Sequence, residues 1–95
     1  MKKTINFYEF RDAFMNLRPN NFSAKGLIAL FEHFEEYEEA TNIQVELDVI
    51  AICCDYTQST IYEALENYGL NSLEELENET IVIHVYMDEI IYLNY

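Results

Sequence analysis

The chain has 95 residues, is 51% hydrophobic and carries a formal net charge of −13. This length predicts a single domain over residues 1–95, and a chain so rich in large apolar side chains is not intrinsically disordered. No apolar run approaches the roughly 18 residues of a transmembrane helix, and polar residues interrupt the N-terminal stretch where a signal peptide would be apolar. We therefore expect a soluble, cytoplasmic protein that makes no contact with a membrane.

Two amphipathic helices are predicted in the first half of the chain. Asn6 is a suitable N-cap, Glu9 completes a capping box with it, and Pro19 ends this first helix. Ser23 is the expected N-cap of a longer helix over residues 24–40. Apolar side chains recur at helical spacing in both segments. They are Phe7, Phe10, Phe14 and Leu17 in the first helix, and Leu27, Leu30, Phe31, Phe34 and Tyr37 in the second.

After the second helix the apolar period changes to two. Alternation over residues 43–47 predicts a short, half-buried strand. Asp48 is a candidate N-cap for a short buried helix that continues to Asp55, but the apolar run 49–54 is equally compatible with a continued strand.

Cys53 and Cys54 are neighbours within this run. A disulfide between adjacent residues is strained, and the CxxC spacing of redox and metal sites is absent. We expect free thiols that are buried as small hydrophobic side chains. We predict no metal site and no cofactor.

Two helices and a hairpin are predicted in the second half. Ser59 is the expected N-cap of a helix that ends at Gly69, and residues 72–78 form a further acidic helical segment. Residues 81–86 and 90–95 are typical of a β-hairpin, and we expect a loop longer than two residues because the acidic pair between them is not a favoured two-residue turn.

The predicted fold is therefore α+β: two N-terminal helices, a short strand, two to three further helices and a C-terminal β-hairpin that forms a small antiparallel sheet. From the second helix onward this order resembles the winged-helix topology. In a DNA-binding winged helix the third helix carries Lys and Arg that meet phosphates. The helix predicted at that position carries Glu63 and Glu66 instead, so direct nucleic-acid binding is not expected.

The charges are distributed unevenly along the chain. All five Lys and Arg lie within the first 25 residues, and sixteen of the eighteen Asp and Glu lie after them. A surface this negative repels nucleic acid and attracts basic proteins or cations. Four glutamates of the 24–40 helix lie three, four or seven positions apart and thus share one face. These candidate partner-binding residues are Glu32, Glu35, Glu36 and Glu39.

The remaining candidate partner-binding residues lie in the last quarter of the chain: Glu74, Glu75, Glu77, Glu79, Asp88 and Glu89. One interpretation is that they extend the row of negative charge on the long helix. The other is that both groups are solvated surface that keeps the protein soluble.

Catalysis is not predicted. His33 and His84 are the only histidines, and neither lies beside a Cys, Ser or Asp in a triad-like pattern. Two glycines are too few for a phosphate-binding loop. We therefore name no catalytic residues.

Eight tyrosines are more than a small core needs. Most are expected at the half-buried edge of the core, although Tyr is also favoured at protein interfaces. Tyr92 is predicted to line one face of the hairpin, which makes the hairpin a candidate homodimer contact.

Three stretches resemble a family of small acidic proteins encoded by bacteriophages and mobile elements: FRDAF (10–14), FSAKGLIALFEHFEEYEE (22–39) and ELDVIAICCDY (46–56). The terminal IVIHV…IIYLNY hairpin also fits this family, so the resemblance covers most of the chain. It implies no catalytic residues. It implies a gene among accessory genes of the kind that encode inhibitors of host defence.

A small phage protein with a strongly negative surface is similar in character to the DNA-mimicking anti-CRISPR and anti-restriction proteins. The leading hypothesis is a phage-encoded inhibitor that places its acidic surface in the basic nucleic-acid-binding cleft of a host defence nuclease. The alternative is a non-enzymatic phage accessory or regulatory module that binds a protein through apolar and Tyr-rich surface, with acidity serving solubility. A third hypothesis is a cation-binding acidic protein.

Overall fold

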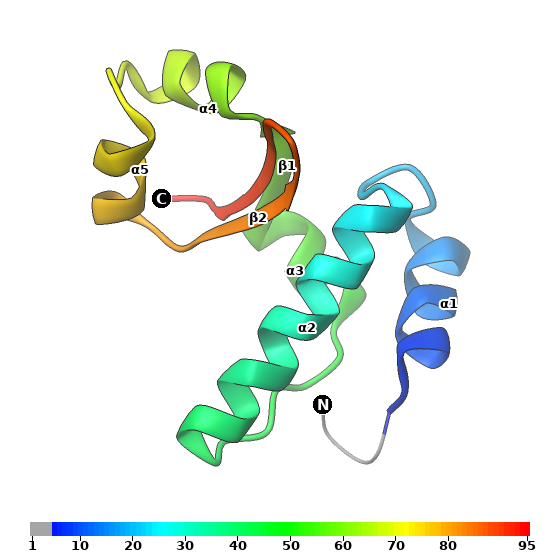
Figure 1. Ribbon diagram of the computed structural model, residues 1–95. Coiled ribbons are helices and arrows are strands. Elements are labelled where there is room, and N and C mark those ends of the chain that lie inside the picture. Colours follow the sequence, from blue (N-terminus) through cyan, green and yellow to red (C-terminus); the bar gives the residue numbers. More distant parts are fainter. Residues whose placement is uncertain (1–4) are drawn as a thin grey trace.

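The computed structural model describes residues 5–95, which form five helices and three strands. In chain order these are α1 (Phe7–Leu17), α2 (Ala24–Thr41), α3 (Val49–Asp55), β1 (Tyr56–Thr60), α4 (Ile61–Tyr68), α5 (Leu73–Glu79), β2 (Val82–Tyr86) and β3 (Glu89–Leu93) (Figure 1). The predicted α+β fold is confirmed.

The strands form one antiparallel sheet in the order β1-β3-β2. β3 lies in the centre, where Tyr92 is opposite Thr57 of β1 and Val82 of β2. The register of β2 shifts between His84 and Tyr86, just before the turn that leads into β3. Both outer strands, β1 and β2, are therefore edges of the sheet.

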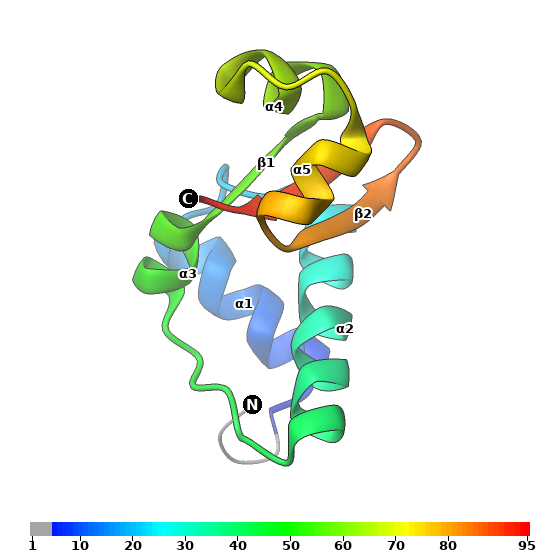
Figure 2. The same cartoon turned by 90° about the vertical axis from the view of Figure 1, so that its left-hand side faces the viewer.

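Helices cover both faces of this sheet. Figures 1 and 2 show α1, α2 and α3 on one side of it and α4 and α5 on the other. Ile83 and Ile91 of the sheet belong to the hydrophobic cluster of the first three helices. Ile90 and Tyr92 belong to a second cluster with residues of α4 and α5. The protein therefore has two small cores, separated by the sheet.

The predicted helix starts are set by local side-chain caps. Asn6 Oδ1 accepts a hydrogen bond from the Glu9 backbone N–H at 2.9 Å, within the predicted capping box. Ser23 Oγ accepts one from Gly26 N–H at 2.9 Å at the start of α2. Asp48 Oδ1 accepts one from Ala51 N–H at 3.1 Å, so residues 49–55 form the short helix rather than a continued strand.

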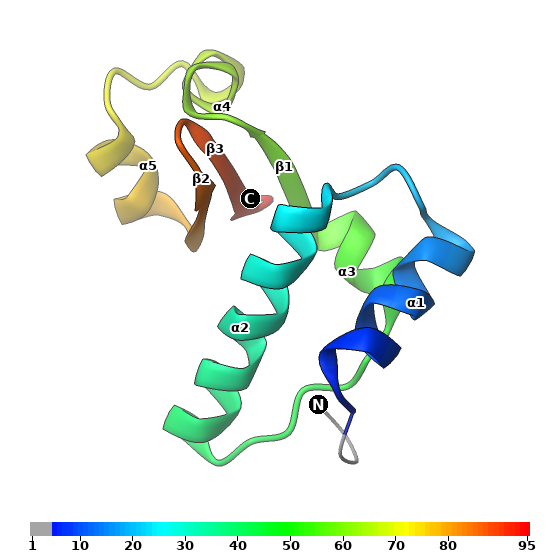
Figure 3. The same cartoon turned by 45° about the vertical axis from the view of Figure 1, so that its right-hand side comes forward.

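The strand predicted at residues 43–47 is wrong. This segment has no regular structure and runs back from the end of α2 to α3 (Figure 3). Its alternation does place Val45 and Leu47 against the first core, but among residues 5–95 no strand pairs with it to form a ladder. The strand forms instead at Tyr56–Thr60, where β3 lies beside it. The order helix, strand, helix, helix, hairpin therefore begins at α3 rather than at α2.

Two local predictions in the second half need correction. Thr60, not Ser59, caps α4: Thr60 Oγ1 accepts from Glu63 N–H at 3.1 Å, and the Glu63 carboxylate accepts from Thr60 N–H at 3.2 Å. Ser59 is instead paired with Ile90 in the sheet. The hairpin loop is shorter than expected, a two-residue turn between Tyr86 and Glu89, because a non-glycine residue there, Met87, adopts φ 53°.

The burial of the cysteines and of several tyrosines also differs from expectation. Cys53 is half-buried and Cys54 is exposed, and both are free thiols. Tyr92 is only 3% exposed because α4 and α5 cover it, so it does not line an open hairpin face. Most of the tyrosines are exposed rather than half-buried, namely Tyr8, Tyr37, Tyr62, Tyr86 and Tyr95.

Candidate acidic interface

The four glutamates of α2 lie on the side of the helix away from its buried stripe. Leu27, Leu30 and Phe34 face the first core. Glu32, Glu36 and Glu39 are exposed and Glu35 is half-buried, as the helical spacing requires for positions opposite that stripe. Figure 3 shows that the C-terminal part of α2, which carries these glutamates, extends beyond the sheet. The shared face predicted for the four glutamates is consistent with this arrangement.

No cation neutralises this face within residues 5–95. The ion pairs there join Arg11 to Asp12 at 3.1 Å and His84 to Glu77 at 3.5 Å, and neither involves α2. Lys25 Nζ instead lies 3.3 Å from the centroid of the Tyr86 ring. Glu32, Glu35, Glu36 and Glu39 therefore have no ion-pair partner among the residues that the structure describes.

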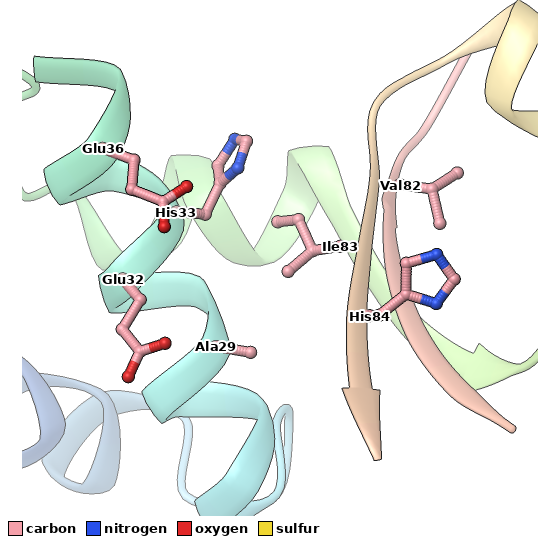
Figure 4. A pocket seen from close by; sticks show the side chains of 7 residues that line it. All are labelled: Ala29, Glu32, His33, Glu36, Val82, Ile83 and His84. Atoms are coloured by element: carbon pink, nitrogen blue, oxygen red, sulfur yellow. The ribbon is translucent and has the colours of Figure 1, made fainter. Parts of the chain in front are cut away.

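A groove runs between α2 and β2. It has a volume of about 260 Å³ and is lined by Ala29, Glu32, His33, Glu36, Val82, Ile83 and His84. Figure 4 shows Ile83 pointing from β2 toward α2, while Val82 and His84 point to the opposite side of the strand. Burial lowers the pKa of His33 from its ordinary value of 6.5, and the nearby Glu36 carboxylate partly opposes this. His33 thus adds little positive charge to the groove at neutral pH.

A second hollow, of about 390 Å³, lies at the C-terminal end of α2. Glu35 and Glu39 line it together with Glu38 and with residues 42–44. The Glu38 carboxylate accepts a hydrogen bond from Val45 N–H at 2.6 Å, which fixes the segment that leaves the helix. The acidic face of α2 therefore borders two depressions: Glu32 and Glu36 line one, and Glu35 and Glu39 line the other.

The acidic residues of α5 lie on the other side of the sheet from α2 (Figure 1). Glu75 accepts a hydrogen bond from Asn71 N–H at 3.0 Å at the start of α5. Glu77 lies 3.5 Å from His84, whose side chain is on the side of β2 opposite to α2 (Figure 4). Glu74 and Glu79 are exposed on the same helix. These residues do not continue the row on α2, because the sheet lies between the two helices (Figure 1).

The two acids of the hairpin lie in different surroundings. Asp88 lies in the turn, and its backbone carbonyl accepts a hydrogen bond from Ile61 N–H at 2.8 Å. Glu89 is half-buried, and its carboxylate accepts from Gln58 Nε2 at 3.5 Å. The Glu89 carboxylate thus helps to hold β3 against β1, and the Asp88 backbone helps to hold the turn against the start of α4, whereas the Asp88 side chain is exposed.

The histidines of the groove were not predicted as neighbours. His33 and His84 are distant in sequence and line the same groove only because α2 packs against β2. The spacing of residues along the sequence does not predict neighbours of this kind. Among residues 5–95, no group of three or more His, Cys, Asp and Glu side chains is placed to hold a metal ion.

Cys53 lies in surroundings that do not activate its thiol as a nucleophile. Burial raises the pKa of the Cys53 thiol, and Arg18 opposes this only in part. A thiol in such surroundings is protonated at neutral pH and reacts slowly.

Within the part of the chain that the structure describes, no helix is both long enough and apolar enough to cross a membrane. Comparison of the sequence and the structure with protein-family models, curated proteins and solved structures finds no match.

Proposed function

We propose that this protein is an inhibitor of a host nucleic-acid-targeting defence system, of the anti-CRISPR or anti-restriction type, in the bacterial cytoplasm. Its acidic surface would bind the basic nucleic-acid-binding cleft of a nuclease. The observation that carries the proposal is the face of α2, where Glu32, Glu35, Glu36 and Glu39 have no ion-pair partner within residues 5–95.

The spacing of these carboxylates fits such a cleft. Residues four apart on a helix are separated by about 6 Å along its axis, similar to the phosphate spacing of a nucleic-acid strand. Glu32 and Glu36 form one such pair, and Glu35 and Glu39 form another. Lys and Arg placed to bind phosphates would meet carboxylates at comparable intervals, and complementary charge would speed association.

The energetic cost of this arrangement also favours a binding role. Like charges four residues apart destabilise a helix by a few tenths of a kcal/mol per pair. Acidic side chains in the last turn are unfavourable because the C-terminus of a helix carries partial negative charge, and α2 has no basic residue there. A helix with only a structural role would gain stability from neutral or basic residues at these positions.

One observation favours the alternative, a module that binds a protein through apolar surface. Tyr62 is 72% exposed and Met87 is 83% exposed, and four further tyrosines are also open to solvent. Exposed Tyr and Met are enriched at protein interfaces. Binding of this kind depends weakly on salt, whereas binding through α2 is strongly salt-dependent.

The two functions are separated by capture from a bacterial lysate with this protein as bait, washed at about 0.1 M and about 0.5 M NaCl. We expect nucleic-acid-binding proteins or nucleases that are retained at low salt and released at high salt. A partner that survives the high-salt wash supports the apolar module instead.

The role of α2 is tested with the quadruple variant E32Q/E35Q/E36Q/E39Q. It should lose capture of the nuclease and inhibition of its cleavage activity, with a melting temperature no lower than that of the wild type because like-charge repulsion is relieved. The matched control is D12N/E46Q/D55N/E66Q, which removes the same number of exposed acids elsewhere. Equal capture and inhibition by the two variants would refute the assignment to α2.

A further inference from the structure

The outer edge of β2 has unused backbone hydrogen-bonding groups. The carbonyl of Ile81 accepts from Leu93 N–H at 3.0 Å, so Ile81 directs its backbone groups toward β3. Because these directions alternate along an antiparallel pair, the backbone N–H and C=O of Ile83 also point toward β3. Those of Val82 and His84 point away from β3. Within residues 5–95, no other segment donates to or accepts from the backbone of Val82 or His84. The unpaired backbone groups of Val82 and His84 could therefore hydrogen bond to an additional strand.

Negative charge borders this edge on both sides. Glu32 and Glu36 line the groove on the α2 side. On the opposite side of the strand, Glu77 lies 3.5 Å from the His84 ring. Side chains of a strand added beside β2 would alternate between these two sides, because successive residues of a strand point to opposite faces.

We propose that β2 binds an extended, basic segment of a protein partner as a fourth strand of the sheet. The backbone of that segment hydrogen bonds to Val82 and His84. Its Lys or Arg side chains alternate toward Glu32 and Glu36 on one face and toward Glu77 on the other. This proposal rests on the proposed function only for the positive charge of the partner; the strand pairing is an independent feature.

A second copy of this chain is a poor occupant. Pairing two β2 edges would bring both sets of acids together, and like charges across a contact are strongly unfavourable. Edge strands flanked by charge resist such self-pairing. The same charges favour a basic segment, so the choice of occupant follows from charge complementarity.

The proposal is tested with the full-length protein and the capped peptide Thr-Lys-Lys-Val-Lys-Lys-Thr, which has two lysines on each face when extended. We expect the saturating peptide to slow hydrogen exchange of the Val82 and His84 amides by about tenfold or more. No slowing there, or slowing at residues 56–60 of the other edge instead, would overturn the proposal.

Backbone pairing is distinguished from simple charge attraction by two N-methylated forms of this peptide, methylated at alternate residues in opposite phases. Both keep every positive charge, but only one loses the N–H groups that face β2. We expect that one to bind about tenfold or more weakly than the other. Equal affinity of the two forms overturns strand addition while leaving the salt-dependent capture of a nuclease untouched.

The acidic flanks are tested with E32Q/E36Q/E77Q, for which we expect about tenfold weaker peptide binding. The matched control E46Q/D55N/E66Q should bind as the wild type does. Equal weakening in both variants would mean that net charge alone attracts the peptide, and would overturn the assignment to this edge.

Discussion

Ile90, Ile91 and Tyr92 follow one another in β3, and each is at most 3% exposed. Successive residues of a strand point to opposite faces, so this burial requires a covering layer on each side of the sheet. Ile91 packs with the first three helices, and its two neighbours pack with α4 and α5. A run of apolar residues without alternation is typical of a strand that is buried on both faces.

Truncation of Ile90 tests this burial. We expect Ile90→Ala to lower the free energy of unfolding by about 2–5 kcal/mol, because it leaves a cavity between the sheet and α4 and α5. Ile81→Ala is the control, since Ile81 is 44% exposed and should cost less than about 1 kcal/mol. Urea unfolding monitored by circular dichroism measures both. Equal losses would contradict the two-sided burial of β3.

At the scale of elements, local caps decide where helices start. Asp48 lies between a segment without regular structure and α3, and its carboxylate accepts from Ala51 N–H. α3 has only 7 residues and so depends strongly on its ends and on the core contacts of Val49 and Ile52. β1 follows α3 directly, which makes the start of α3 important for the placement of the strand.

We expect Asp48→Ala to lower the free energy of unfolding by about 1 kcal/mol, because a free backbone N–H is left at the start of α3. Asp55→Ala, at the other end of the same helix, is the control. It should change stability little, because removing an acid from a helix C-terminus is mildly favourable. Thermal unfolding of both variants at the same ionic strength is the measurement, and a larger loss in Asp55→Ala would contradict the role of the cap.

At the scale of the whole molecule, acidity opposes folding. The net charge is −13, and after residue 25 the chain contains no Lys or Arg. Compaction brings these acids together, so self-repulsion destabilises the folded state, and salt relieves it by screening.

We therefore expect the melting temperature to rise between about 0.02 M and about 0.5 M NaCl. Relief of about 1 kcal/mol would correspond to an increase of about 4–8 °C for a chain of this size. The E32Q/E35Q/E36Q/E39Q variant should show a smaller increase, because part of the repulsion is already gone. A melting temperature that does not respond to salt would show that the acids are too far apart to repel one another.

Only the part of the candidate site that lies on a single helix could be predicted from the sequence. The shared face of Glu32, Glu35, Glu36 and Glu39 follows from the helical repeat, since neighbours on one helix are related by local geometry. The relation of that face to Glu77, His84 and the β2 edge depends on how α2 packs against the sheet, which no sequence spacing records. The sequence left open whether the acids of α5 extend the row on α2, and the structure places the two helices on opposite sides of the sheet (Figure 1).

Although it left residues 49–54 open between helix and strand, the sequence by itself determined the α+β class, the caps at Asn6 and Ser23, and the C-terminal hairpin. These depend on contacts within a few residues, through helix caps and apolar periodicity. The tertiary structure decided that residues 56–60, rather than 43–47, form a strand, and that α4 and α5 close the second face of the sheet. A strand exists only where another strand meets its hydrogen-bonding groups, and here the partner is β3, roughly thirty residues further along the chain. Non-local pairing of this kind is fixed by packing of the whole chain, so local sequence patterns do not reveal it.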